Sequence, residues 1–83
     1  MAYAISNQYA NEGTASTDQE VSLPWPSQLV EIINDSGLVD LQYKFNPNEP
    51  YATLKPLEVV NIYMHTSTIY LNGSGAYRIR VRG

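Results

Sequence analysis

Short stretches of alternating apolar and polar residues, separated by turn-forming residues, constrain this fold more than any other feature of the sequence. In DLQYKFN (40–46), the apolar residues Leu41, Tyr43 and Phe45 alternate with polar ones, and AYRIRVR (76–82) repeats the pattern. A period of two places the apolar side chains on one face of a β-strand. No window longer than a turn shows the 3.6-residue period of an amphipathic helix. The chain is therefore predicted to consist of β-strands.

Turn-forming residues divide the rest of the chain into further short segments. Pro24 and Pro26 flank Trp25, which excludes a helix there, and NGSG (72–75) is a strong turn signal. The other strand candidates are QLVEIIN (28–34), YATL (51–54), VVNIYMH (59–65) and TIYL (68–71). We expect an all-β fold, a small antiparallel β-sandwich or barrel of six to seven short strands with an extended N-terminal arm.

The first 20 residues differ in composition from the remainder. They are polar and rich in small residues, with too few apolar side chains to form a strong core-facing row. We predict a flexible N-terminal arm over residues 1–20, ordered on a partner, followed by a β-sandwich domain over 21–83. The alternative is a first edge strand that includes Tyr3, Ile5 and Tyr9.

Size and residue usage restrict the class of protein. A chain of 83 residues is one small domain, which buries only roughly 60–65% of its unfolded surface and is marginally stable alone. The absence of cysteine excludes disulfides and thiolate metal sites and favours an intracellular assembly site. No apolar run reaches the length of a membrane span, and the start of the chain lacks the features of a signal peptide. We expect no membrane partner.

The sequence carries little that resembles catalytic chemistry. Its net charge of −3 argues against non-specific binding of nucleic acid, which needs a positive surface. The single histidine, His65, lies in MHTST, which matches no nucleophile motif. The acidic residues are scattered singly, so no convergent metal-ligand set is predicted. We expect no enzymatic activity, no cofactor, no metal and no nucleic-acid partner.

Three arginines at every second position form the most distinctive surface feature. On a strand, Arg78, Arg80 and Arg82 project to one face while the apolar residues between them project to the core. One interpretation pairs this arginine row with acids of the same domain, such as Glu31, Asp40 or Glu58. The other pairs it with carboxylates of another chain. The sequence leaves both open.

Aromatic residues form the second surface feature. Trp25 and the tyrosines at 51, 63 and 70 either cover the sheets and close one end of the sandwich, or form a stacking or protein-binding surface. We favour the packing role.

The elements PWPSQLVEIINDSG, LKPLE and LNGSGAYRIRVRG (together spanning much of 24–83) resemble small all-β virion proteins of tailed bacteriophages. In such proteins a strand of the form V-x-I-x-N-D-S leads into an alternating strand. A T-L-K-P-G-E turn follows later, and a glycine-rich hairpin ends in residues like GAYRIRVRG. This chain has Leu57 where that turn pattern has glycine, which leaves the type of turn open.

The resemblance implies a non-enzymatic structural protein that binds the outer capsid surface and stabilises the shell, as a decoration (cement) protein. Its partner would be the major capsid protein, and it would self-associate, with a trimer favoured over a dimer. It would be located on the capsid surface of a virion assembled in the host cytoplasm. The alternatives are a tail or head–tail accessory virion protein and a carbohydrate- or receptor-binding β module. The expected partner contacts are Tyr3, Ile5, Tyr9, Trp25, Arg78, Arg80 and Arg82.

Overall fold

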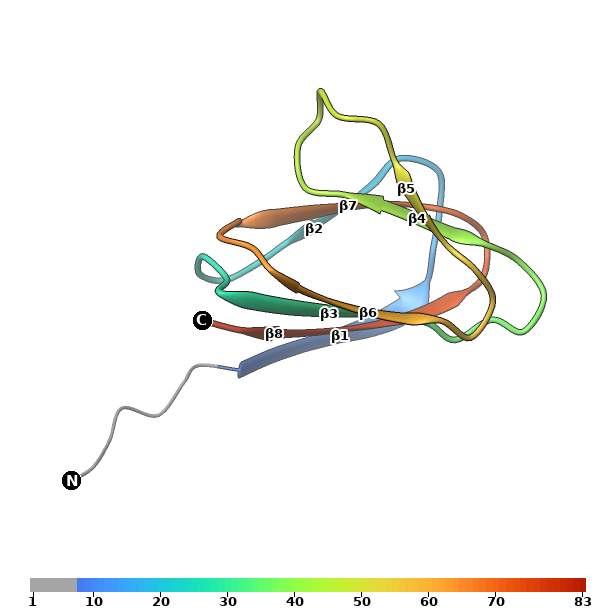
Figure 1. Ribbon diagram of the computed structural model, residues 1–83, viewed down its shortest axis with the longest axis horizontal. Coiled ribbons are helices and arrows are strands. Elements are labelled where there is room, and N and C mark those ends of the chain that lie inside the picture. The colour runs from blue at the N-terminus through green and yellow to red at the C-terminus, as the bar shows by residue number, and fades with distance from the viewer. Residues whose placement is uncertain (1–7) are drawn as a thin grey trace.

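Two four-stranded antiparallel sheets face each other in the computed structural model, which describes residues 8–83 (Figure 1). The strands are β1 (Gln8–Thr14), β2 (Gln19–Ser22), β3 (Leu29–Asn34), β4 (Leu41–Lys44), β5 (Ala52–Leu54), β6 (Val59–Tyr63), β7 (Thr68–Asn72) and β8 (Ala76–Arg82). Sheet A has the order β1-β8-β3-β6, and sheet B has the order β2-β7-β4-β5. The all-β prediction is confirmed, with eight strands in the described part of the chain instead of six or seven. Those residues form no helix that is long and apolar enough to cross a membrane.

The order of pairing shows how the chain is wound. β1 pairs with β8, β2 with β7, β3 with β6 and β4 with β5, so the two halves of the chain form one long antiparallel ribbon. The ribbon is rolled up because β3 also pairs with β8, and β4 with β7. Two facing sheets with this nested pairing form an eight-stranded jelly roll. This winding places β8 in the middle of sheet A.

The predicted N-terminal arm is wrong for residues 8–20, and so is the domain boundary at 21. β1 pairs with β8 along its whole length, from Gln8 opposite Arg82 to Thr14 opposite Ala76, and β2 begins at residue 19. An edge strand of an antiparallel sheet needs only a few apolar side chains on its inner face, because its outer face is in water. A mostly polar sequence can therefore form such a strand. Tyr9 supplies one of these inner side chains and packs against the core, as the edge-strand alternative expected for it. Tyr3 and Ile5 lie outside the described residues.

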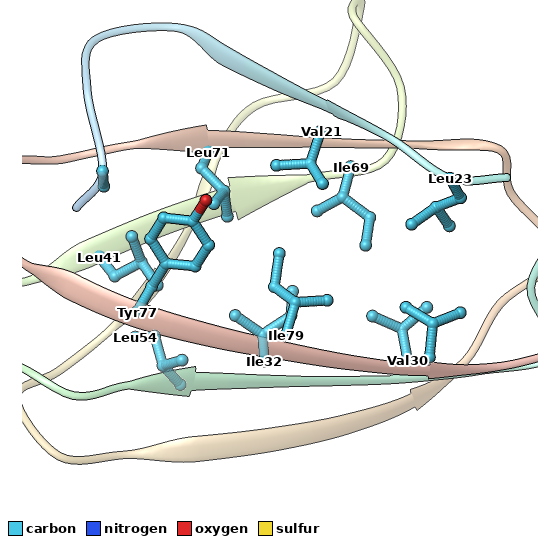
Figure 2. Packing of buried hydrophobic residues seen from close by; sticks show 12 residues of the cluster. Val21, Leu23, Val30, Ile32, Leu41, Leu54, Ile69, Leu71, Tyr77 and Ile79 are labelled. Atoms are coloured by element: carbon cyan, nitrogen blue, oxygen red, sulfur yellow. The ribbon is translucent and has the colours of Figure 1, made fainter. Parts of the chain in front are cut away.

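Apolar side chains from both sheets fill the space between them (Figure 2). As predicted, Tyr77, Ile79 and Val81 of β8 point inward and are almost fully buried. The buried cluster comprises Ala15, Val21, Leu23, Val30, Ile32, Leu41, Leu54, Ile69, Leu71, Tyr77, Ile79 and Val81. Because inward residues alternate with outward ones along β8, this core fixes the direction in which the three arginines project.

A buried asparagine organises the loop that follows β3. The amide of Asn34 donates to the carbonyls of Val39 and Leu54 at 2.9 and 3.0 Å, and its side-chain oxygen accepts from the backbone N–H of Ser36 at 3.0 Å. Asn34 is 1% exposed, so these bonds satisfy a polar group that water does not reach. The loop over 35–40, which carries Asp35, is thereby held against the end of both sheets.

The turn between β5 and β6 contains an exposed leucine in the left-handed backbone conformation. Leu57 has φ of 65° and a side chain that is largely exposed. Pro56 precedes it, and the N–H of Glu58 donates to the carbonyl of Lys55 at 3.0 Å, which closes a β-turn. Proline at the second position and positive φ at the third are the features of a type II turn, which normally takes glycine there. The glycine of the bacteriophage-type pattern therefore has a conformational basis, and this chain departs from it.

Candidate protein-binding face

The outer face of sheet A is organised around β8, whose arginines lie between β1 and β3. Arg78 is opposite Glu12 on β1 and Ile33 on β3. The three arginines form one straight row because successive outward residues of a strand are about 7 Å apart. Although they share a face, their surroundings differ strongly from one end of the row to the other.

Arg78 is paired within its own domain. Its Nε donates to Oδ2 of Asp35 at 2.6 Å and its second guanidinium nitrogen to Oδ1 at 3.0 Å, a two-point contact. This hydrogen bond, and then the charge of Asp35, raise the pKa of Arg78 above its ordinary value, while Glu12 and Glu31 add smaller contributions. The fork of Arg78 is therefore occupied by an acid one residue beyond the end of β3.

Arg80 is held only loosely. Its nearest carboxylate within the described chain is Glu31 on β3, at 3.8 Å between the nearest nitrogen and oxygen. The side chain of Arg80 is 63% exposed, and on its other side it faces the methyl group of Ala10. An exposed pair at this distance contributes at most about 1 kcal/mol. Arg80 therefore retains most of its hydrogen-bonding capacity.

Arg82 has no carboxylate within 4.0 Å among residues 8–83. Its neighbours across the sheet are Gln8 and Leu29, neither of which carries a charge. Arg82 is exposed to solvent. The arginine row thus runs from a guanidinium bonded at two points by Asp35 at 78 to an open one at 82.

Arg80 lies at the centre of three shallow hollows in this face. One hollow of about 270 Å³ lies toward Glu12 and Arg78, and one of about 390 Å³ lies toward Gln8 and Arg82. The third, of about 220 Å³, lies on the side of Glu31 and Arg82. Ala10 lines the first two, and its short side chain leaves room beside the arginine. The three hollows would let carboxylate groups reach the guanidinium of Arg80 from more than one direction.

On the outer face of sheet B, the polar groups around Lys44 are paired with one another. Lys44 donates to the carbonyl of Pro47 at 3.1 Å and lies 4.3 Å from the ring centroid of Tyr51. The hydroxyl of Tyr51 donates to Asp18 at 2.9 Å. Burial, followed by this hydrogen bond and the charge of Asp18, raises the pKa of Tyr51. Such a closed network leaves little for a partner to bind.

The structure gives the aromatic residues different surroundings. Trp25 is half-buried, packs on the core and lies against Gly83, where an added Cβ atom would collide with its ring. This is the packing role that we favoured for Trp25. Tyr63, in contrast, is 86% exposed on β6 and is the most open tyrosine of the described chain.

Within 8–83 no three His, Asp or Glu side chains converge to hold a metal ion. His65 is an exposed residue after β6. The chemistry that this surface does offer is the binding of carboxylates by guanidinium groups.

Sequence reasoning identified one of the two ion-pair acids and missed the other. Glu31 is the partner of Arg80, as one interpretation expected, whereas Asp40 and Glu58 do not pair with the row. The carboxylate of Glu58 instead accepts from the N–H of Lys55 at 2.7 Å. Asp35 was missed because it follows β3 in a turn, where alternation no longer predicts direction. Its position in the N-D-S motif was the available signal.

Comparison with known proteins identifies the fold only. No model of a known protein family matches the sequence, and no curated protein sequence matches it. A de novo designed double-stranded β-helix, solved by solution NMR, matches the structure with a TM-score of 0.52 and 18% sequence identity. The match covers 92% of this chain and 96% of the designed one. It agrees with the nested pairing of the two sheets.

Proposed function

We propose that this chain is a non-enzymatic structural protein that binds an acidic protein surface through the outer face of sheet A. The observation that carries the proposal is the unequal pairing along the arginine row. Arg78 makes a two-point contact with Asp35, Arg80 has one long contact with Glu31, and Arg82 has no acidic neighbour in the described chain. Guanidinium groups on a rigid strand lose little freedom when they bind carboxylates, which favours their use in recognition.

The acidic surface that we propose is that of a bacteriophage capsid, with the major capsid protein as the partner. Support comes from the resemblance of residues 24–83 to small virion proteins, whose shared motifs have structural roles in this fold. Asn34 and Ser36 of N-D-S anchor a loop, and Asp35 orients Arg78. Jelly rolls also occur among viral capsid domains, which is an analogy of fold alone. On this proposal the protein stabilises the shell as a decoration protein.

A matched pair of charge reversals tests the proposal. Arg80→Glu changes the proposed binding face, and Lys44→Glu changes the outer face of sheet B by the same charge. We expect Arg80→Glu to weaken co-sedimentation with capsids that lack the protein by roughly tenfold or more, and Lys44→Glu to leave it nearly unchanged. Binding of the unaltered protein should also weaken as salt rises, because exposed charges are screened over about 8 Å at physiological ionic strength.

Three results would contradict parts of the proposal. Equal losses for the two variants would reject sheet A as the binding face. Density for the chain at the neck or tail of an intact virion would favour the accessory-protein alternative. Binding to immobilised polysaccharide without capsids would favour the carbohydrate-binding alternative, for which the exposed ring of Tyr63 is the specific observation.

A further inference from the structure

The outer edge of sheet A at β6 has open backbone groups at alternate residues. The N–H of Asn34 donates to the carbonyl of Glu58 at 2.9 Å, and that of Met64 donates to the carbonyl of Gln28 at 3.1 Å. In an antiparallel ladder, hydrogen-bonded residues alternate with residues whose backbone groups point the other way. Even-numbered residues of β6 therefore bond to β3. The N–H and C=O groups of Val59, Asn61 and Tyr63 point away from the sheet.

The same three residues carry exposed side chains. Val59 is 50% exposed, Tyr63 is 86% exposed, and Asn61 between them is also exposed. Exposed edges are normally protected by charge, proline or short length. β6 has no charged residue and no proline over Val59–Tyr63. By comparison, β1 and β2 carry Glu12 and Glu20, and β5 has only three residues.

We infer that β6 pairs with β6 of a second copy of this chain, antiparallel and about a two-fold axis at Asn61. In this register Asn61 is opposite Asn61 of the partner subunit, and Val59 is opposite Tyr63 of the partner subunit. All open backbone groups of the edge are then used, in about six inter-subunit hydrogen bonds. The result is one continuous sheet of eight strands.

Side-chain matching supports a second copy as the occupant. A valine opposite a tyrosine is a favourable cross-strand pair, and the two-fold axis creates this pair twice. Each pair extends an apolar row that runs across the sheet. Tyr63 lies opposite Leu29 of β3, and Val59 lies opposite Ile33 of β3. Asn61 side chains can hydrogen-bond to each other at the axis.

Charge supports the same arrangement. The chain has a net charge of −3, so two copies repel each other wherever acidic surfaces meet. The β6 edge brings together no like charges, since its five residues are all uncharged. Pairing β6 with β1 of another copy would instead place Val59 and Tyr63 beside Gln8, Ala10 or Glu12. Such β6–β1 pairing would also leave one unpaired edge at each end of the assembly, so further copies could add. Pairing of β6 with β6 about a two-fold axis gives a closed dimer.

The proposed dimer leaves the arginine rows accessible. β8 is separated from β6 by β3, and the two-fold axis keeps both outer faces of sheet A on one side of the dimer. A dimer would therefore present two arginine rows to one surface and bind it bivalently. The dimer itself does not depend on the proposed capsid function, so the two can fail separately.

Sedimentation of the full chain over a range of concentrations tests the inference, with two variants. We expect the unaltered protein to be in a monomer–dimer equilibrium. Tyr63→Lys should weaken the dimer at least roughly tenfold, because it places a cation beside an apolar row. Thr53→Lys adds the same charge on β5, an edge strand of sheet B, and should leave the equilibrium unchanged. Both positions are exposed, so circular dichroism should show intact folding.

Asn61→Cys provides a second readout that does not depend on affinity changes. The chain has no cysteine, so any disulfide must join two copies. Residues in a hydrogen-bonded antiparallel pair have Cα atoms about 5.5 Å apart, within the range that a disulfide spans. Under mild oxidation Asn61→Cys should form a dimer much faster than Thr53→Cys, which places the thiol on the β5 edge of sheet B. A monomer at all concentrations, a trimer, equal effects of the two lysine variants, or equal oxidation rates would overturn the inference.

Discussion

The outer faces of the two sheets are built on the same jelly-roll frame but differ in how completely their polar groups are paired. On sheet B, Lys44 is covered by Tyr51 and bonded to Pro47, and Tyr51 is bonded to Asp18. On sheet A, pairing decreases along the arginine row until Arg82 has no acidic neighbour in the described chain. Tyr63 and Val59 are exposed on the same sheet.

This difference is the reason why we propose sheet A as the face that contacts partners. A closed network such as that on sheet B has already formed the interactions that a partner would offer, so binding there would break bonds before forming new ones. Exposed guanidinium groups and apolar side chains on a rigid strand carry no such penalty. On the function that we propose, recognition belongs to sheet A and self-contained packing to sheet B, and the following predictions are ranked by expected effect.

We expect the largest effect on stability from the asparagines that end a strand in each sheet, Asn34 in sheet A and Asn72 in sheet B. Asn34→Ala in sheet A removes three buried hydrogen bonds and should lower the free energy of unfolding by about 3 kcal/mol. Asn72→Ala in sheet B removes bonds to Gln42 and Asp18 near the surface and should cost about 1 kcal/mol or less. Urea unfolding with unchanged m-values measures both. Similar losses would show that the amide pairs of sheet B are as important as the anchor of sheet A.

Leu57 tests whether the turn that leads into β6 of sheet A is conformationally strained. Leu57→Gly relieves the left-handed conformation in the turn that leads from sheet B into β6. It should stabilise the protein by roughly 0.5–1 kcal/mol, since relief of strain exceeds the added freedom of the unfolded chain. Leu38→Gly is the matched control, because Leu38 is 91% exposed without positive φ and should give no gain. Thermal unfolding that shows equal gains would contradict strain as the cause.

The smallest expected effect concerns Tyr51, whose ionisation tests the network of paired groups on the outer face of sheet B. Its pKa is raised above the ordinary 10.0, so the folded state favours the neutral phenol. This stabilisation is fully present below pH 10 and is lost as pH rises through the raised pKa. An absorbance titration, with Tyr51→Phe to identify the signal, should show late ionisation. Asp18→Asn should remove only part of the increase in the Tyr51 pKa, since burial is its largest cause. An unchanged Tyr51 pKa in this variant would show that Asp18 does not contribute to it.

The sequence was sufficient to predict the strands from β3 to β8, because each shows either alternation or a run bounded by turn residues. It also predicted which residues of β8 are buried. It did not predict that residues 8–20 join the sheets. β1 is paired on one side only and lightly covered, so its sequence is polar enough to look like a flexible segment.

The state of each arginine could not be predicted from the sequence alone. Alternation places all three on one face, but their partners depend on the loop after β3 and on the register with β1. Asp35 reaches Arg78 because Asn34 holds that loop in place. Ala10 leaves space beside Arg80 because β1 pairs with β8 in this particular register. Both facts are tertiary and have no local pattern.

The nested pairing of the strands also determines the order in which the protein can assemble. β8 is the strand that joins β1 to β3 in sheet A, and β7 is the strand that joins β2 to β4 in sheet B. Both lie within residues 68–82 and leave the ribosome after the strands that they join. Neither sheet can be completed before then, and nearly all pairing connects distant parts of the chain, which slows folding. During synthesis β1 and β2 therefore stay unpaired until residues 68–82 supply β7 and β8, their partner strands.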